Sequence, residues 1–343
     1  MKLYYLLITA FLFCTFIVNA QEEEEEKEPK GKISGMVYFN YHLDSTEDAE
    51  QTSVFEVTRA YFGYQYKINE KFTSKVLFDA GKNEGGSDYT IFIKNAKLDY
   101  KAEDWLTLTA GIFGLKQFKD QEDFWGYRYL FKSLEDEYKF GPSADVGVMA
   151  GIKINDKMKA HIMAVNGEGF RNLQDRSGKN RYGLNLVYQP VSNLILKAYY
   201  DTMKGIDIED ESQNTIVSNI ALFAGYRIND RFRIAGEYSL MQDGVEFNKP
   251  SKNKDLRGLS FYSAYNINKK WNVFGRYDDL SSNRLSGEMM DWNFSEDEST
   301  IIAGFEFKPT KGVNTSINYR FTDFDDPENN NESLLFFNLE FYF

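Results

Sequence analysis

The chain ends with ESLLFFNLEFYF (332–343), in which an uninterrupted apolar series alternates with a mixed one. The apolar series is Leu335, Phe337, Leu339, Phe341 and Phe343, and the mixed series is Phe336, Asn338, Glu340 and Tyr342. Successive side chains of a strand point to opposite faces, so this alternation predicts a strand with one apolar face. A tilted strand that crosses a bilayer needs about 9–11 residues. The stretch is therefore long enough to cross a membrane.

The same period-2 pattern fills nearly all of the chain after Gly31. It predicts sixteen strands: 32–43, 52–68, 71–80, 88–101, 105–114, 144–154, 157–166, 179–189, 193–204, 214–228, 231–242, 255–267, 270–280, 298–308, 313–324 and 332–343. These runs are long for strands of soluble proteins, whose usual length is about 5–6 residues. A soluble sandwich is therefore a poor explanation for them.

The connections between the runs alternate in length. Every second one is tight, such as Asn69-Glu70, Asn155-Asp156 and Asn229-Asp230, and those between them are longer and mostly polar, such as 281–297. Short turns at one end and long loops at the other are typical of outer-membrane barrels. We therefore expect an all-β, 16-stranded antiparallel transmembrane β-barrel at residues 32–343. An even number of strands would place both termini on the periplasmic side.

Composition supports this class and argues against others. Aromatic residues make up 16% of the chain, which favours strands, and the mean hydropathy of −0.51 is too low for a bundle of transmembrane helices. The net charge of −12 argues against a nucleic-acid partner, because such partners reward basic surfaces. The sole cysteine, Cys14, precedes the predicted barrel, so we expect no disulfide and no thiol chemistry.

The first twenty residues have the features of a secretory signal peptide. Lys2 precedes an apolar run, and Val18-Asn19-Ala20 forms a small-residue cleavage site. The run is short for a membrane anchor and has no basic flank. Residues 21–31, which contain Glu22 to Glu26, then read as an acidic, solvated periplasmic tail. We expect a cell outer-membrane location in a Gram-negative envelope.

Aromatic residues gather beside the predicted short turns, as in the girdles of outer-membrane barrels. They are Tyr66, Tyr100, Trp105, Tyr188, Tyr226, Phe232, Tyr265, Trp271 and Phe307. The final Phe343 resembles the signal by which the barrel assembly machinery recognises such proteins. The expected partners are therefore outer-membrane lipid, lipopolysaccharide and that machinery.

The longest connection, 115–143, is also the least polar. Phe124, Tyr127, Phe131, Leu134 and Tyr138 recur at spacings of three or four, which predicts a short amphipathic helix that Asp120 could cap. An aromatic loop of this length should not stand exposed in water. We expect it to fold into the barrel and narrow the pore, and a lid over the mouth remains the alternative.

Strand parity places more cations than anions on the inner wall. The inward cations are Arg59, Lys67, Lys75, Lys97, Lys153, Lys159, Arg181, Lys197, Arg227, Arg233, Arg276, Lys308 and Arg320, and the inward anions are Asp79, Asp99, Asp201, Glu237, Asp278, Glu306 and Glu340. A cationic wall favours anions, although local pairs such as Arg276 with Asp278 could neutralise it. The predicted pore and constriction residues are Lys116, Lys119 and Arg128 on the loop and Arg59, Lys75, Lys97, Arg181, Arg227, Arg233, Arg276 and Arg320 on the wall.

No pattern in the chain indicates catalysis. The two histidines, His42 and His161, lack metal-ligand spacing and have no marked nucleophile as a partner. We therefore expect no catalytic residue, no metal ligand and no cofactor. The acidic stretches 296–298 and 323–326 could bind calcium, but they match no calcium-loop pattern.

Several short motifs resemble the phosphate-selective porin O/P family. They are Phe55 to Gly63, Phe72 to Asp79, Asn95 to Tyr100, Leu106 to Gly111 and Ala144 to Val148, and they occur in the order of that family. The resemblance runs from about residue 33 to Phe343. It implies a 16-stranded porin, usually trimeric, with its third loop folded inward.

Together, these observations predict a porin for passive diffusion of small anionic or neutral solutes, with an anion preference and phosphate as one possible solute. An alternative is a channel specific for an oligosaccharide or another nutrient, in which aromatic side chains guide a sugar. A barrel used mainly for structure or surface interaction is a third class. The sequence leaves the solute, the pore diameter and the oligomeric state open.

Overall fold

The computed structural model describes residues 30–49, 52–83, 86, 88–173 and 179–343. Its strands are β1 (Lys30–Asp44), β2 (Ser53–Lys67), β3 (Phe72–Lys82), β4 (Tyr89–Glu103), β5 (Leu106–Gly114), β6 (Ala144–Asn155), β7 (Met158–Val165), β8 (Arg181–Val191), β9 (Leu194–Ile206), β10 (Asn214–Ile228), β11 (Phe232–Gln242), β12 (Gly244–Glu246), β13 (Lys249–Pro250), β14 (Leu256–Asn266), β15 (Trp271–Ser282), β16 (Glu298–Thr310), β17 (Val313–Phe324) and β18 (Glu332–Tyr342). Two short helices, α2 (Lys119–Trp125) and α3 (Leu134–Glu137), lie between β5 and β6.

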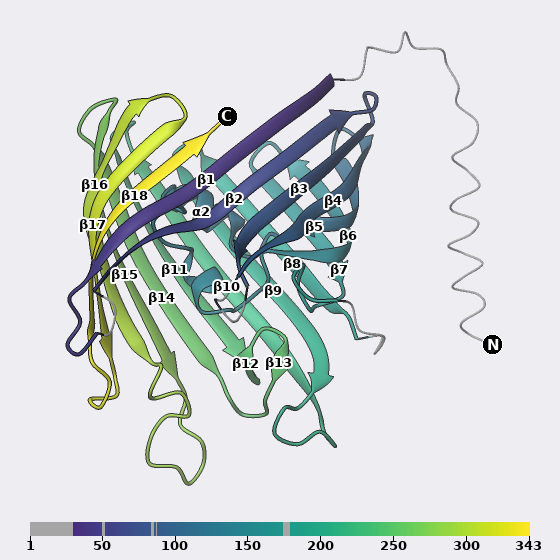
Figure 1. Ribbon diagram of the computed structural model, residues 1–343. Helices are drawn as coiled ribbons and strands as arrows, with labels where there is room; N and C mark the ends of the chain where they lie inside the picture. Colours follow the sequence, from purple (N-terminus) through teal and green to yellow (C-terminus); the bar gives the residue numbers. More distant parts are fainter. Residues whose placement is uncertain (1–29, 50–51, 84–85, 87, 174–178) are drawn as a thin grey trace.

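In this described part of the chain, sixteen strands form one closed antiparallel barrel (Figure 1). β18 closes the barrel against β1, where Tyr38 lies opposite Glu340. β12 and β13 form a separate two-stranded sheet within the connection between β11 and β14. The predicted fold class, a 16-stranded antiparallel β-barrel, is confirmed.

The barrel strands match the sixteen predicted runs to within two residues at each end. β1 begins at Lys30, so the expected tail at 21–31 ends earlier than predicted. β8 continues through Pro190 to Val191, which leaves Ser192 and Asn193 as the turn to β9. The predicted signal peptide and the acidic part of the tail lie outside the described residues.

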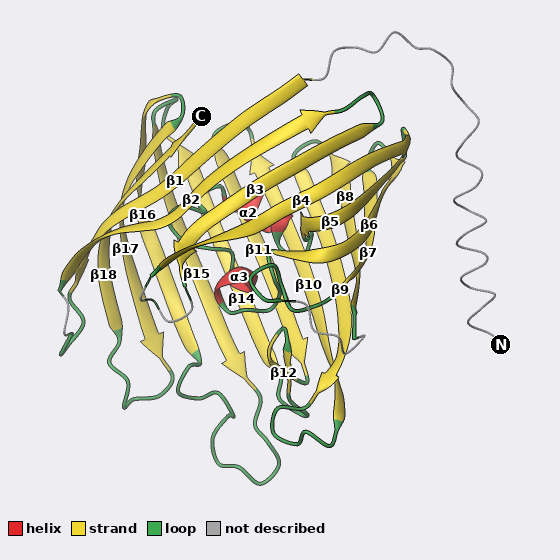
Figure 2. Cartoon of the chain, turned by 45° about the vertical axis from the view of Figure 1, so that its right-hand side comes forward, coloured by secondary structure: helices red, strands yellow, loops and turns green. Residues whose placement is uncertain are grey.

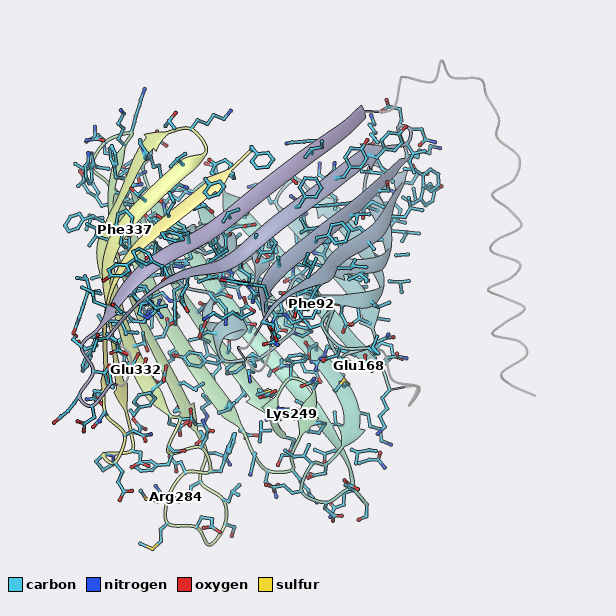
Figure 3. All side chains as sticks on the ribbon, in the orientation of Figure 1. Phe92, Glu168, Lys249, Arg284, Glu332 and Phe337 are labelled. Atoms are coloured by element: carbon cyan, nitrogen blue, oxygen red, sulfur yellow. The ribbon has the colours of Figure 1, made fainter. Side chains whose placement is uncertain are left out.

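The two faces of the wall differ in polarity and exposure. Along β10, the outward residues Ile216 and Leu222 are about half exposed, whereas the inward residues Val217 and Phe223 are buried. Large exposed apolar side chains cover the outside of many strands, and Figure 3 shows Phe337 of β18 there. A continuous apolar belt of this size would be unfavourable in water and suits contact with lipid.

The two ends of the barrel carry different connections. The start of β1 and the end of β18 lie at the end with the short turns, and the long loops extend from the opposite end (Figures 1 and 2). The rings of Trp271 and Phe307 contact each other near the short turns, with centroids 4.6 Å apart and a tilt of 32°, and both face outward. No helix of the described residues is long and apolar enough to cross a membrane.

A register shift in β4 changes which side chains face inward. Leu77 pairs with Asn95 and Phe78 pairs with Ile93, so Lys94 is an extra residue in a β-bulge. The bulge brings Lys94 to the inner face beside Asp79, at 3.4 Å. Strict alternation through β4 places Lys94 outside, and for this reason it is missing from the predicted inner wall.

Candidate pore constriction

The connection 115–143 forms two short helices rather than the single amphipathic helix that was predicted. Gly126 adopts a left-handed conformation with φ of 74° and ends α2 at Trp125. The predicted N-cap, Asp120, lies inside the first turn of α2, where it pairs with Lys197 at 3.1 Å. The N-cap position belongs to Phe118, which makes no side-chain capping bond.

Aromatic side chains of this loop pack on inward-facing rings of the wall. Trp125 and Tyr127 are each 1% exposed. The ring of Trp125 lies 5.2 Å from that of Tyr262, and the ring of Tyr127 lies 4.5 Å from that of Phe274. Buried aromatic pairs of this kind stabilise contacts beyond the area that they bury. The loop thus shares one apolar core with β14 and β15.

Two wall glycines provide the space for this packing. A Cβ atom at Gly225 would lie 2.7 Å from the ring of Phe124, and one at Gly258 would lie 2.4 Å from Leu134. Leu134 itself is fully buried. The absence of side chains at these wall positions therefore allows the loop to approach the wall closely.

Cations of the wall donate to backbone carbonyls of the loop. Arg233 donates to Trp125 O at 2.9 Å, Arg276 to Lys132 O at 2.7 Å and Arg320 to Leu130 O at 3.1 Å. Lys197 donates to the carbonyls of two further loop residues, both at 2.6 Å. A buried irregular segment needs such partners, because its carbonyls have no strand or helix to bond. These wall cations therefore hold the loop.

Guanidinium groups of the wall also lie over aromatic rings of the loop. Arg276 lies 5.3 Å from the ring of Trp125, Arg320 lies 4.2 Å from Phe131, and Arg227 lies 4.4 Å from Phe124. A cation over an aromatic face contributes about 0.5–2 kcal/mol, more when it is desolvated. Each of these arginines was predicted as a pore residue, and the structure places each against the loop.

Two predicted pore residues are fully enclosed. Arg181 forms an ion pair with Asp201 and donates to Phe247 O, and Arg276 forms an ion pair with Asp278 at 2.6 Å. The side chains of both arginines and both aspartates are completely buried. Arg181 and Arg276 therefore do not present a free charge to a solute. Their geometry matches the alternative of local pairing considered for the Arg276–Asp278 pair.

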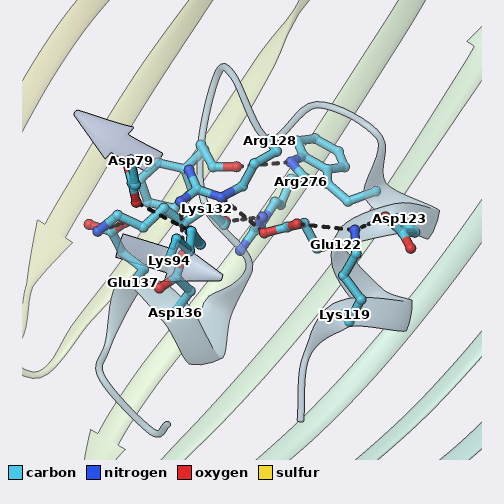
Figure 4. A network of polar contacts seen from close by, with 12 residues as sticks. Asp79, Lys94, Lys119, Glu122, Asp123, Arg128, Lys132, Asp136, Glu137 and Arg276 are labelled. Atoms are coloured by element: carbon cyan, nitrogen blue, oxygen red, sulfur yellow. Dashed lines mark hydrogen bonds and ion pairs between the residues drawn. The ribbon is translucent and has the colours of Figure 1, made fainter. Parts of the chain in front are cut away.

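The predicted cations on the loop are more accessible but mostly paired (Figure 4). Lys119 pairs with Glu122 at 3.5 Å and with Asp123, and Arg128 bridges Glu122 and Asp136, at 2.9 Å each. Burial raises the pKa of the Asp136 carboxyl, but Arg128 and the neighbouring cations lower it by more, so the net direction is downward. Loop charges are therefore organised mainly within the loop.

Lys75 and Lys97 lie on the inner wall of β3 and β4, and Lys116, just after β5, lies within electrostatic reach of Lys97. Lys75 lies directly opposite Lys97 in the β3–β4 ladder, and Asp99 pairs with Lys97 at 2.7 Å. Burial lowers the pKa of the Lys116 ammonium, and nearby Lys97 lowers it further. Like charges directly opposite each other repel, so this group carries an excess of positive potential.

A buried carboxyl group lies between the loop and the wall. Glu135 is fully buried, and of its oxygens Oε1 accepts a bond from Gln121 Nε2 at 2.9 Å, whereas Oε2 has no hydrogen-bond partner. Burial raises the pKa of the Glu135 carboxyl to about 7. Glu237 of β11 lies within electrostatic reach, and neither of its buried oxygens is hydrogen-bonded.

Two cavities that share lining residues lie between the loop and the wall, one at β1, β2, β17 and β18 and the other at β2–β4. The β1 cavity, of about 300 Å³, includes Tyr38, Asn40 and Phe336, and the β4 cavity, of about 590 Å³, includes Asp79 and Lys94. Both are lined by Arg59, Arg128, Lys132 and Glu137. The predicted residues Arg59 and Arg128 thus line both cavities.

The two histidines lie on separate strands of the wall, β1 and β7. His161 lies 3.3 Å from Asn185, and His42 lies 3.9 Å from Glu56, on well-separated strands. Among the described residues, no three His, Cys, Asp or Glu side chains are placed to hold a metal ion.

The fold is similar to that of several solved outer-membrane proteins. Residues 175–341 match the model of the outer membrane protein beta-barrel domain. The anion-selective porin from Comamonas acidovorans superposes with a TM-score of 0.68 at 10% identity, covering 92% of this chain and 100% of the porin. Salmonella typhi OmpF, in a complex with daunomycin, gives 0.69 at 14% identity, with coverages of 91% and 98%.

The outer membrane channel DcaP of Acinetobacter baumannii has a TM-score of 0.68 at 12% identity, covering 93% of this chain and 99% of DcaP. The curated protein sequences give no significant match. The C-terminal half of the chain therefore matches an outer-membrane β-barrel domain, and the barrel has the fold of these porins.

Proposed function

We propose that this protein is an outer-membrane porin through which small hydrophilic solutes diffuse passively, with a preference for anions. A 16-stranded barrel leaves an aqueous channel unless something fills it. The loop 115–143 forms the inward-folded constriction, supported by its contacts with Tyr262, Phe274 and the wall arginines. Solutes pass between this loop and β1–β5.

The anion preference rests on the Lys75–Lys97 pair with Lys116 beside it. Lys97 pairs with Asp99, and the acid nearest to Lys116 in effect, Asp120, is also bound by Lys197, while the wall arginines are occupied by the loop. Cationic groups that line a narrow aqueous path favour anions over cations. Phosphate is one candidate solute, as the resemblance to the porin O/P family implies.

The reversal potential across a KCl gradient tests this preference. We expect a chloride-selective potential for the refolded protein in a planar bilayer. Lys75→Gln should lower the chloride-to-potassium permeability ratio roughly twofold, because a partly screened charge contributes on the order of 0.5 kcal/mol. Lys204, on the outer face of β9, provides the matched control, and Lys204→Gln should leave the ratio unchanged. A cation-selective potential in the unmodified protein would refute the proposal.

We further propose that residues 1–20 direct secretion and that both termini face the periplasm. The short turns at the end of the barrel where β1 starts and β18 ends support this orientation, because outer-membrane barrels have short periplasmic turns. Lipid, lipopolysaccharide and the barrel assembly machinery are the proposed partners.

A homotrimer is the proposed assembly. A trimer form is described for OmpT of Vibrio cholerae, which has a TM-score of 0.62 with this chain at 12% identity, with coverages of 92% and 100%. Light scattering in detergent should therefore give three times the mass of one chain. A single-chain mass would contradict this assembly.

A further inference from the structure

The β4 cavity has more positive than negative lining groups. Seven cationic and five acidic side chains line its volume of about 590 Å³. The lining comes from β2, β3 and β4, from the loop 115–143, from residues 168–172 and from residues 246–249. Figure 3 shows Glu168 and Lys249 in the half of the barrel that carries the long loops.

The positive excess is concentrated around one carboxylate. Arg59 lies 3.5 Å and Lys94 lies 3.4 Å from different oxygens of Asp79, which is fully buried. Arg59 Nη1 is buried and makes no hydrogen bond in this geometry. The nearby Asp136 is already bound by Arg128 at 2.9 Å. Two cations therefore share one acid in a poorly solvated place, which favours an additional anion.

Aromatic rings fix the positions of these cations. Lys94 Nζ lies 5.0 Å from the ring of Tyr61 and 5.3 Å from that of Phe170. The guanidinium of Arg171 lies 5.1 Å from the ring of Phe92 and 5.7 Å from that of Phe170. An aromatic face attracts a cation but does not cancel its charge. Lys94 and Arg171 are thus held in place without losing their charge.

The cavity also offers apolar surface. Pro142, Phe170 and Phe247 line it together with two glycines of the loops. Its volume falls within the range of about 300–1,000 Å³ for sites of small organic ligands, and an inorganic ion would leave most of it to water. The lining matches a ligand that has both a charged group and an apolar body.

We infer that the β4 cavity binds small organic carboxylates, with the carboxylate among Arg59, Lys94 and Arg171 and the apolar body toward Phe170 and Phe247. This inference rests on the proposed porin function, and it adds a class of solute and a binding site on the path. Guanidinium and ammonium groups form charge-assisted hydrogen bonds with carboxylates, which makes these three cations suitable partners.

Current block by benzoate tests the inference. Benzoate added to the compartment facing the long loops should reduce the single-channel chloride current with saturation. Lys94→Gln and Arg171→Gln should each raise the half-blocking concentration roughly tenfold, as expected for the loss of one charge-assisted hydrogen bond. Lys159→Gln is the matched control, because Lys159 is an inward lysine of β7 outside the cavity, and it should leave the block unchanged.

Two further probes separate the parts of the inference. Neutral benzyl alcohol should not block, and inorganic phosphate should block only at much higher concentrations. Equal block by benzoate and phosphate would overturn the role of the apolar surface. Block that persists unchanged in both variants, or no block at all, would overturn the site. If the site is overturned, a chloride-selective reversal potential would still leave the proposed porin function intact. If benzoate blocks the channel but the reversal potential is cation-selective, only the anion preference would be refuted.

Discussion

The double variant Gly225→Val, Gly258→Val should conduct several-fold more current per channel than the unmodified protein. Valine at these positions would overlap Phe124 and Leu134 of the docked loop, since even a single Cβ would lie 2.7 Å and 2.4 Å from them. Overpacking costs about 1–3 kcal/mol per site. Valine also favours strands, so we expect the barrel to persist and the loop to leave the wall.

Gly275→Val provides the matched control for this result. Gly275 is also a barrel glycine, on β15, and its added Cβ would meet nothing closer than 3.9 Å. Its channels should conduct like those of the unmodified protein. Limited proteolysis should cut the loop 115–143 in the double variant alone. Unchanged conductance with a protected loop in the double variant would show that the wall tolerates valine and that the glycines do not determine docking.

The sequence predicted the barrel well because its signal is local and repeated. Apolar and mixed side chains alternate in each strand because one face of the strand meets lipid and the other faces the barrel interior. The same kind of pattern therefore recurs in each of the sixteen strands. Lys94 shows where this logic fails: a single extra residue in β4 reverses the parity, and alternation alone gives no sign of it. Arg171 was missed because it belongs to a long loop, where no periodicity applies.

The roles of the wall arginines were beyond reach of the sequence for a different reason. Parity correctly placed Arg233, Arg276 and Arg320 on the inner face, but it could not show what they touch. Their partners are backbone carbonyls of the loop, and every residue type supplies the same carbonyl. The aromatic spacing from Phe124 to Tyr138 indicated a buried loop segment. The break at Gly126 then divided the expected helix.

Raising the pH should loosen the loop in the unmodified protein, and Glu135→Gln should abolish this response. The docked loop raises the pKa of the Glu135 carboxyl from 4.5 to about 7, chiefly because burial disfavours its charged form. The docked state therefore binds the proton more tightly than a released state. Docking is strongest below pH 4.5, weakens as the pH rises toward 7, and changes little above that value. The loss of docking free energy amounts to about 3 kcal/mol.

Burial sets this direction against most of the groups around Glu135. Lys197 of β9 and the side chains of Gln117 and Ser239 favour the ionised form, but less strongly than burial disfavours it, and Asp201 opposes it as well. Lys197 is itself paired with Asp120 at 3.1 Å and also donates to loop carbonyls, so it is only partly available to Glu135. Ionised Glu135 would keep one buried oxygen without a hydrogen-bond partner. Such a group is costly to bury, which is why a neutral amide at this position should keep the loop docked.

Glu137→Gln is the matched control, because Glu137 is an acid of the same helix, is about one-third exposed and pairs with Lys132 at 3.1 Å. Conductance fluctuations recorded between pH 5 and pH 8 should increase with pH in the unmodified protein and in Glu137→Gln, and stay constant in Glu135→Gln.

The same increase in Glu135→Gln would assign the response to another group. Glu237 is then the next candidate, since its two buried oxygens have no hydrogen-bond partner and it lies within electrostatic reach of Glu135. A response abolished only by Glu135→Gln would link protonation beneath the loop to the width of the channel.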